Sequence, residues 1–103
     1  MTIYALSSGP GLSGIAVIRI SGPKTSQAIE LLTGKSVPKP RVATLRKINK
    51  INTSELIDEG LILWFPGPQS YTGEDMAEIQ VHGSKAVVDA LHSTLSEIEN
   101  CRL

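Results

Sequence analysis

The chain has 103 residues, which is enough for one compact domain with a hydrophobic core and too few for two. A hydrophobic fraction of 41% and a charged fraction of 19% exclude an intrinsically disordered chain. Ten basic and ten acidic residues give a formal net charge of zero, which argues against a domain that binds nucleic acid through bulk charge.

Cysteine content and hydropathy restrict the environment in which this chain works. Cys101 is the only cysteine, so an internal disulfide is impossible, a structural zinc site is not expected, and we assign the thiol no chemistry. No apolar run has the length of a membrane span, and the N-terminus lacks the basic and apolar pattern of a secretory signal. We therefore expect a cytoplasmic domain with no membrane partner and no bound metal.

The first two predicted strands, residues 2–6 and 15–21, are joined by a glycine-rich loop over residues 7–14. A phosphate-binding loop would need a lysine and a hydroxyl residue after its last glycine, at the start of a helix. Gly14 instead leads into a strand, so we reject a phosphate-binding loop. The loop is either a tight connection or the lining of a ligand site.

Arg19 interrupts the apolar strand over residues 15–21, where it shares a face with Ile15 and Val17. A guanidinium group in such a strand is costly unless it is paired or reaches a wet cavity. Two interpretations follow: a salt bridge to a neighbouring strand, with Glu78 as the candidate partner, or a contact to an anionic ligand.

The middle of the chain predicts a helix and two further strands. Ser21-Gly22-Pro23 is typical of a helix start, and Gly34 of its end. A strand is predicted over 41–48, near a sheet edge, followed by a hairpin loop over 49–55 and a strand that ends at Phe65. Basic residues gather between positions 35 and 50, either as a solvated edge, which we favour, or as a nucleic-acid face.

The stretch from Phe65 to Gly83 is the most informative part of the sequence. Two prolines, at positions 66 and 68, stop the preceding strand, and a polar turn follows over residues 70–75. Residues 77–82 then alternate between apolar and polar, which predicts a strand with two unlike faces. Its polar face carries a carboxylate, an amide and an imidazole: Glu78, Gln80 and His82.

The last predicted helix covers residues 84–98, and residues 100–103 turn extended, as if a strand were beginning where the chain stops. The predicted order is strand, strand, helix, strand, strand, strand, helix, which defines an α+β domain. About five strands with only two helices leave one sheet face poorly covered. We therefore expect a symmetric homodimer, with a ligand site close to the shared surface.

Three motifs in fixed order resemble the N-terminal domain of the MnmE/TrmE family of tRNA modification GTPases. They are Gly14-Ile-Ala-Val-Ile-Arg-Ile-Ser-Gly-Pro23, the block from Phe65 to Asp75, and Glu78-Ile-Gln-Val-His-Gly83. The resemblance implies a folate-binding domain similar to a subdomain of the glycine cleavage T-protein. It also implies a homodimer that binds formyl-tetrahydrofolate near the dimer interface.

The same resemblance implies a role for a longer parent protein. That parent would work with the flavoprotein MnmG to build a carboxymethylaminomethyl or aminomethyl group on the wobble uridine of tRNA, with tetrahydrofolate as the one-carbon source. GTP, magnesium and potassium would bind in a separate GTPase domain. Residues 1–103 would then be one truncated folate-binding and dimerisation domain that is not an enzyme by itself.

Carried over residue by residue, the family's folate-contacting arginine falls on Arg19 and its folate-contacting glutamate on Glu78. Gly11, Gly14 and His82 are candidate lining residues, with the His82 ring expected to bond backbone beside the ligand rather than act as a general base. Two alternatives stay open: a purely structural dimerisation module in which Arg19 and Glu78 only pair, and a tRNA-contacting module.

Overall fold

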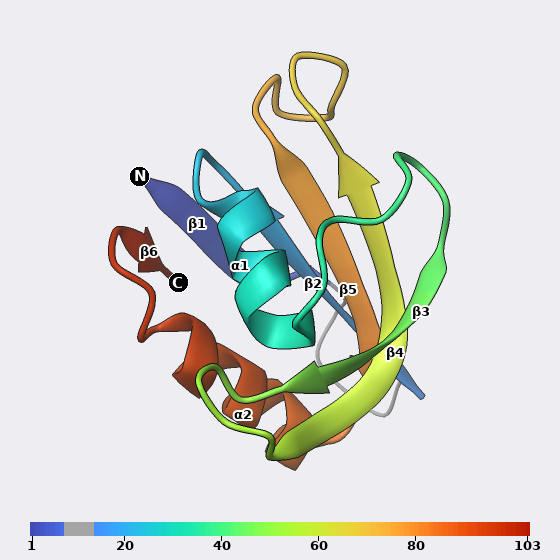
Figure 1. Cartoon of the computed structure of the whole chain (residues 1–103), viewed down its shortest axis with the longest axis vertical. Helices are drawn as coiled ribbons and strands as arrows, with labels where there is room; N and C mark the ends of the chain where they lie inside the picture. The colour runs from blue at the N-terminus through green and yellow to red at the C-terminus, as the bar shows by residue number, and fades with distance from the viewer. Residues whose placement is uncertain (8–13) are drawn as a thin grey trace.

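The computed structural model describes residues 1–7 and 14–103, so Gly11 lies outside the described residues. The described chain forms one six-stranded mixed sheet with two helices on one of its faces (Figure 1). The predicted α+β class is confirmed, and the first seven elements follow the predicted order. The strands and helices are β1 (Thr2–Leu6), β2 (Ile15–Ser21), α1 (Thr25–Thr33), β3 (Thr44–Asn49), β4 (Leu56–Phe65), β5 (Met76–His82), α2 (Lys85–Leu95) and β6 (Cys101–Arg102).

The sheet has the strand order β3-β4-β5-β2-β1-β6. All neighbouring pairs are antiparallel except β1 and β6, which are parallel. The two strands that carry the predicted site residues, β2 and β5, are therefore direct neighbours in the middle of the sheet. β3 lies at one edge, as predicted, and the short β6 adds a strand at the other edge.

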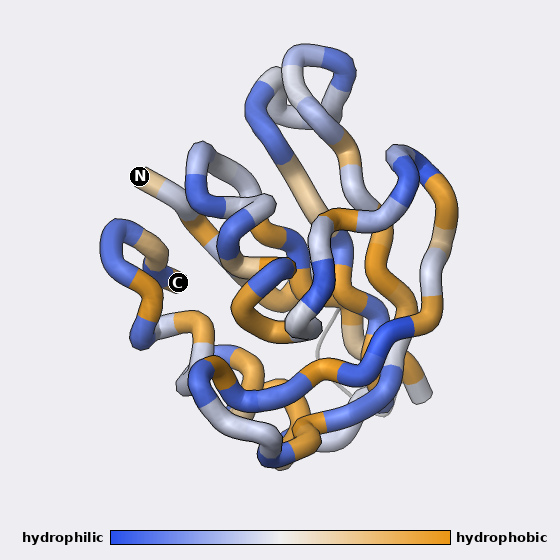
Figure 2. Tube along the Cα trace, viewed as in Figure 1, coloured by the Kyte–Doolittle hydropathy of each residue, from blue (hydrophilic) through white to orange (hydrophobic). Residues whose placement is uncertain are grey.

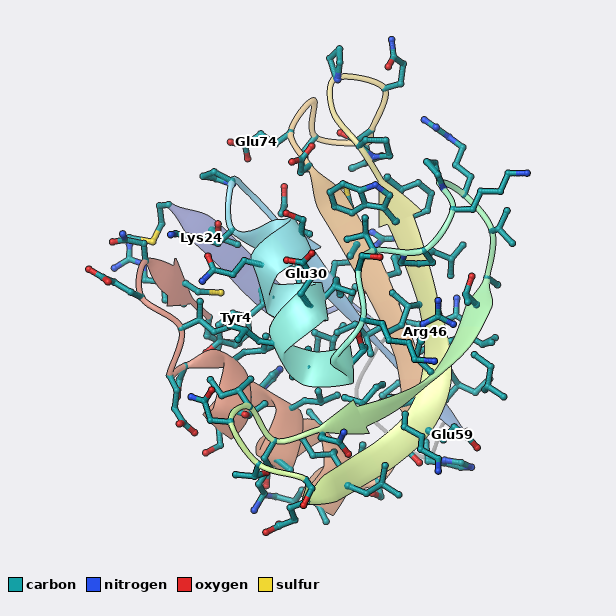
Figure 3. The ribbon with its side chains drawn as sticks, in the orientation of Figure 1. Tyr4, Lys24, Glu30, Arg46, Glu59 and Glu74 are labelled. Carbon is teal, nitrogen blue, oxygen red and sulfur yellow. The ribbon has the colours of Figure 1, made fainter. Side chains whose placement is uncertain are left out.

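Alternation along the central strands separates a core face from an open face. Ile18 and Ile20 on β2 and Ile79 on β5 are fully buried and belong to one hydrophobic cluster with residues of both helices. Figure 2 shows the apolar positions recurring along the helices and the central strands. Tyr4 lies in this core, and its hydroxyl donates to the His92 carbonyl at 3.2 Å (Figure 3). Both helices thus cover the same face, which confirms the expectation that the other face is left without helices.

The predicted starts of the first helix and of the edge strand were wrong. Ser21 does not cap α1 but ends β2, because Gly22 adopts a φ of 137° and donates its N–H to the Asp75 carbonyl, so the helix begins only at Thr25. The edge strand begins at Thr44 rather than at position 41, because Arg41 has a left-handed φ of 64°, which is incompatible with a strand.

The second helix is shorter than predicted and ends at Leu95, with turn and bend residues continuing to Asn100. Its start agrees with the sequence, since the Ser84 hydroxyl accepts the Val87 N–H at 3.1 Å as an N-cap. Neither helix of the described chain is long and apolar enough to cross a membrane.

Candidate ligand site

The loop between β4 and β5 is closed on itself and tied to β2. The Gly67 N–H donates to Asp75 Oδ1 at 2.9 Å, and a Cβ on Gly67 would lie only 2.9 Å from the Gly73 carbonyl oxygen. The hydroxyl groups of Thr72 and Ser21 are 2.8 Å apart, which joins the loop to the end of β2. Figure 3 shows this loop at the end of the sheet, with an acidic side chain, Glu74, labelled on it. These contacts explain why the sequence places glycine and small hydroxyl residues here.

Arg19 and Glu78 occupy facing positions of the β2–β5 ladder on the open face. Arg19 Nε donates to Glu78 Oε2 at 3.0 Å, so the salt bridge, one of the two interpretations of Arg19, is present. The side chain of Glu78 is 19% exposed and that of Arg19 is 48% exposed. Among the described residues, this is the only hydrogen bond of either side chain, so Glu78 Oε1 and the two terminal nitrogens of Arg19 remain available to a ligand.

The ion pair forms one side of a pocket of about 460 Å³. That volume lies within the roughly 300–1,000 Å³ typical of small-molecule sites. The β4–β5 loop forms another side, and its Tyr71 side chain is 90% exposed. Tyr71 also lines an adjoining hollow of about 410 Å³ that extends toward β1. The pocket is lined by Arg19, Arg41, Phe65, Gln69, Ser70, Tyr71, Met76 and Glu78.

Arg41 is a lining residue that the sequence reading missed as part of the site. Its N–H donates to the Trp64 carbonyl at 2.9 Å, and its guanidinium carbon lies 6.0 Å from the centre of the Phe65 ring. Its Nη2 donates to the Gln69 carbonyl in the loop. Because Arg41 was read as part of an edge strand, its charge was grouped with the other basic residues between positions 35 and 50. The Pro-Lys-Pro sequence directly before it was the available signal for a turn that redirects the side chain.

Gly14 and His82 lie elsewhere on the open face. Both line a pocket of about 190 Å³ whose other walls include Ile15 and Leu61. On β5, His82 is four residues from Glu78, which at about 3.3 Å per residue is roughly 13 Å along the strand. The structure therefore brings Arg19 and Glu78 together and places Gly14 and His82 at a separate hollow.

His82 is held by Asp58, a residue that the sequence reading did not select. The His82 backbone N–H donates to Asp58 Oδ2 at 2.9 Å, and ring nitrogen Nδ1 lies 3.0 Å from the same oxygen. Burial raises the pKa of Asp58, but the hydrogen bonds from His82 and from the Glu59 backbone, together with the attraction of the His82 charge, outweigh burial, so the pKa lies below its ordinary value. The ring thus pairs with a carboxylate and not with backbone as expected, because the β4–β5 pairing brings the start of β4 beside the end of β5.

Together these features define an α+β domain with an open sheet face, on which a charged pair borders a pocket closed by a structured loop. The family described as "GTP-binding protein TrmE N-terminus" matches residues 2–103, and the chain therefore belongs to that family.

Curated relatives are similar over 85% to 100% of the chain. The tRNA modification GTPase MnmE of Pelagibacter ubique is 73% identical over 103 residues, which cover 100% of this chain and 23% of the relative. MnmE of Sinorhizobium medicae is 52% identical over 98% of this chain and 22% of the relative. The mitochondrial tRNA modification GTPase mss1 of Schizosaccharomyces pombe is 54% identical over 85% of this chain and 18% of the relative. The chain thus spans less than a quarter of the length of these relatives.

Proposed function

We propose that this chain is the N-terminal part of a tRNA modification GTPase and that it binds a tetrahydrofolate derivative, formyl-tetrahydrofolate, in the pocket beside Arg19 and Glu78. The names of the relatives support the tRNA modification role of the longer protein. One observation carries the ligand proposal. Glu78 Oε1 and the terminal nitrogens of Arg19, which have no hydrogen-bond partner among the described residues, belong to side chains that line a 460 Å³ pocket.

The chemistry of these groups fits a reduced pterin. A pterin edge presents several N–H donors, which suit the free oxygen of Glu78, and its carbonyl suits the guanidinium of Arg19. Phe65, Tyr71 and Met76 supply apolar and aromatic surface for the rest of the ligand. When bound, the folate supplies a one-carbon unit, and the residues of this chain bind and orient it.

The open face supports the proposal of a homodimer. Ile3, Ile15 and Leu45 are large apolar residues that lie more than half exposed on this face. A second copy of the domain would cover them and bring its own surface close to the pocket. In the longer protein, GTP with magnesium and potassium would bind to another domain, and MnmG and tRNA would be the cytoplasmic partners.

Titration with formyl-tetrahydrofolate tests the ligand proposal directly. We expect saturable binding by calorimetry at one site per chain, and an increase in melting temperature with ligand concentration. A chain that is folded but shows neither effect at millimolar ligand would refute folate binding and favour the purely structural role of the ion pair.

A further inference from the structure

The pocket contains a second guanidinium group, that of Arg41, which has no countercharge among the described residues. Three of its lining side chains carry full charges, and the carboxylate of Glu78 already pairs with Arg19. Within the described part of the chain, Arg41 makes no salt bridge, and its only side-chain hydrogen bond goes from Nη2 to the neutral Gln69 carbonyl. Nε and Nη1 of Arg41 therefore remain free to bind an anionic group.

Arg41 is held in place before any ligand arrives. The backbone hydrogen bond to Trp64 fixes its main chain, while the Phe65 ring and the Gln69 carbonyl hold the guanidinium. A side chain with this many contacts loses less rotational freedom on binding than a lysine on an open surface. Its planar group is also suited to bidentate recognition of a carboxylate.

Arg41 and Glu78 line the pocket from segments on different sides of β4. β4 separates them, since β5 carries Glu78 and the main chain of Arg41 is bonded to Trp64 on β4. In Figure 1 the segment that leads into β3 passes beside the end of β4, on the side away from β5. Two strand spacings of about 4.8 Å put the main chains of Arg41 and Glu78 roughly 10 Å apart. A ligand that spans the distance between these two segments would be elongated, with N–H donors at the Glu78 end and an anion at the Arg41 end.

We propose that Arg41 binds the carboxylate tail of this elongated ligand, while Arg19 and Glu78 bind its donor-bearing ring. For the proposed folate, Arg41 contacts the glutamate tail, so this inference rests on the proposed function. The pocket then selects against pterins that lack the acidic tail.

The experiment compares two ligands on matched variants. Formyl-tetrahydrofolate and a formylated 6-methyltetrahydropterin, which lacks the benzoylglutamate tail, are titrated by calorimetry into the wild-type chain, Arg41→Gln and Lys39→Gln. Lys39→Gln removes a nearby exposed cation that does not line the pocket. We expect Arg41→Gln to weaken formyl-tetrahydrofolate binding about tenfold to a hundredfold and to leave binding of the tail-less pterin unchanged. Lys39→Gln should leave both affinities unchanged.

Comparing the two ligands distinguishes a direct contact of Arg41 with the ligand's tail from an indirect effect of the substitution on the β4–β5 loop. If Arg41→Gln only loosened the β4–β5 loop, both ligands would lose affinity equally, and that result would overturn the inference. Unchanged affinity for formyl-tetrahydrofolate in Arg41→Gln would overturn it as well, while leaving folate binding intact. Failure of the wild-type chain to bind formyl-tetrahydrofolate would instead remove the proposed function and this inference together. Arg41→Lys provides a second check, since it keeps the charge and should recover only part of the lost affinity.

Discussion

Arg19 and Glu78 form a 3.0 Å ion pair across the β2–β5 ladder, and that pair uses one oxygen of the carboxylate and one nitrogen of the guanidinium. The pairing satisfies the charge of each residue on the open face. It also leaves the second oxygen and the terminal nitrogens without hydrogen bonds among the described residues. A structural ion pair and a ligand site are therefore compatible in the same two residues.

Glu78→Gln should separate these two roles. The substitution keeps the shape but places an N–H₂ group where one oxygen stood, so one pterin N–H would face another donor. We expect formyl-tetrahydrofolate affinity to fall about tenfold to a hundredfold, which corresponds to about 1–3 kcal/mol. Glu97→Gln, at an exposed position of the C-terminal segment, removes the same charge and should leave the formyl-tetrahydrofolate affinity unchanged. Chemical denaturation of the same proteins measures the structural contribution. A large loss of stability, with no folate binding by the parent chain, would favour the purely structural alternative.

Asp58→Asn should make the free energy of unfolding less dependent on pH in the acid range. The pKa of folded Asp58 lies below the value of about 3.9 in an unfolded chain. The ionised carboxylate therefore stabilises the fold in full above about pH 4, and this stabilisation is lost as the pH falls through the folded pKa. We expect the variant to be about 1–3 kcal/mol less stable than the wild type at pH 5. That gap should shrink toward pH 2. Urea denaturation at several pH values checks this, with Asp89→Asn on the exposed surface of α2 as the control. A gap that stayed constant from pH 5 to pH 2 would contradict it.

Ile15→Glu should prevent dimer formation. Ile15 lies at the start of β2 on the open face and is 54% exposed, so a charge there would be buried against the second copy without a partner. Sedimentation velocity should show dimers for the wild-type chain and monomers for the variant. Gln27→Glu adds the same charge to an exposed position of α1, outside the open face, and should still dimerise. Monomers in all three proteins at high concentration would contradict the proposed assembly.

GTP should have no effect on this chain. The sequence contains no Gly-x-x-x-x-Gly-Lys-Ser/Thr motif, and Gly14 opens a strand where a phosphate-binding loop would open a helix. We expect no hydrolysis and no change in melting temperature at millimolar GTP with magnesium. Saturable, magnesium-dependent turnover by the purified chain would disprove this expectation.

The alternation of apolar and polar residues was enough to predict the strands and their two faces. Arg19 breaks an apolar pattern, and a charge in such a position needs a partner or a wet cavity, so the sequence alone could name Glu78, on the polar face of its strand, as a candidate partner. Ser84 likewise marked the start of α2, because its hydroxyl bonds a backbone group three residues away. These features depend on residues close together in the chain or on one repeating period.

Arg41, Asp58 and the division of the open face into separate pockets depended on contacts between distant segments. Arg41 reaches the site because its left-handed backbone conformation and its backbone hydrogen bond to Trp64 direct the side chain toward the β4–β5 loop. There it contacts Gln69, 28 residues further along the chain. Asp58 meets His82 only through the register of β4 against β5. Local patterns carry no information about register between strands or about the direction of a turned side chain. The sequence by itself therefore determined the order of the elements and named Glu78 as a candidate partner of Arg19. The tertiary structure decided that the two residues pair and which further residues share the pocket with them.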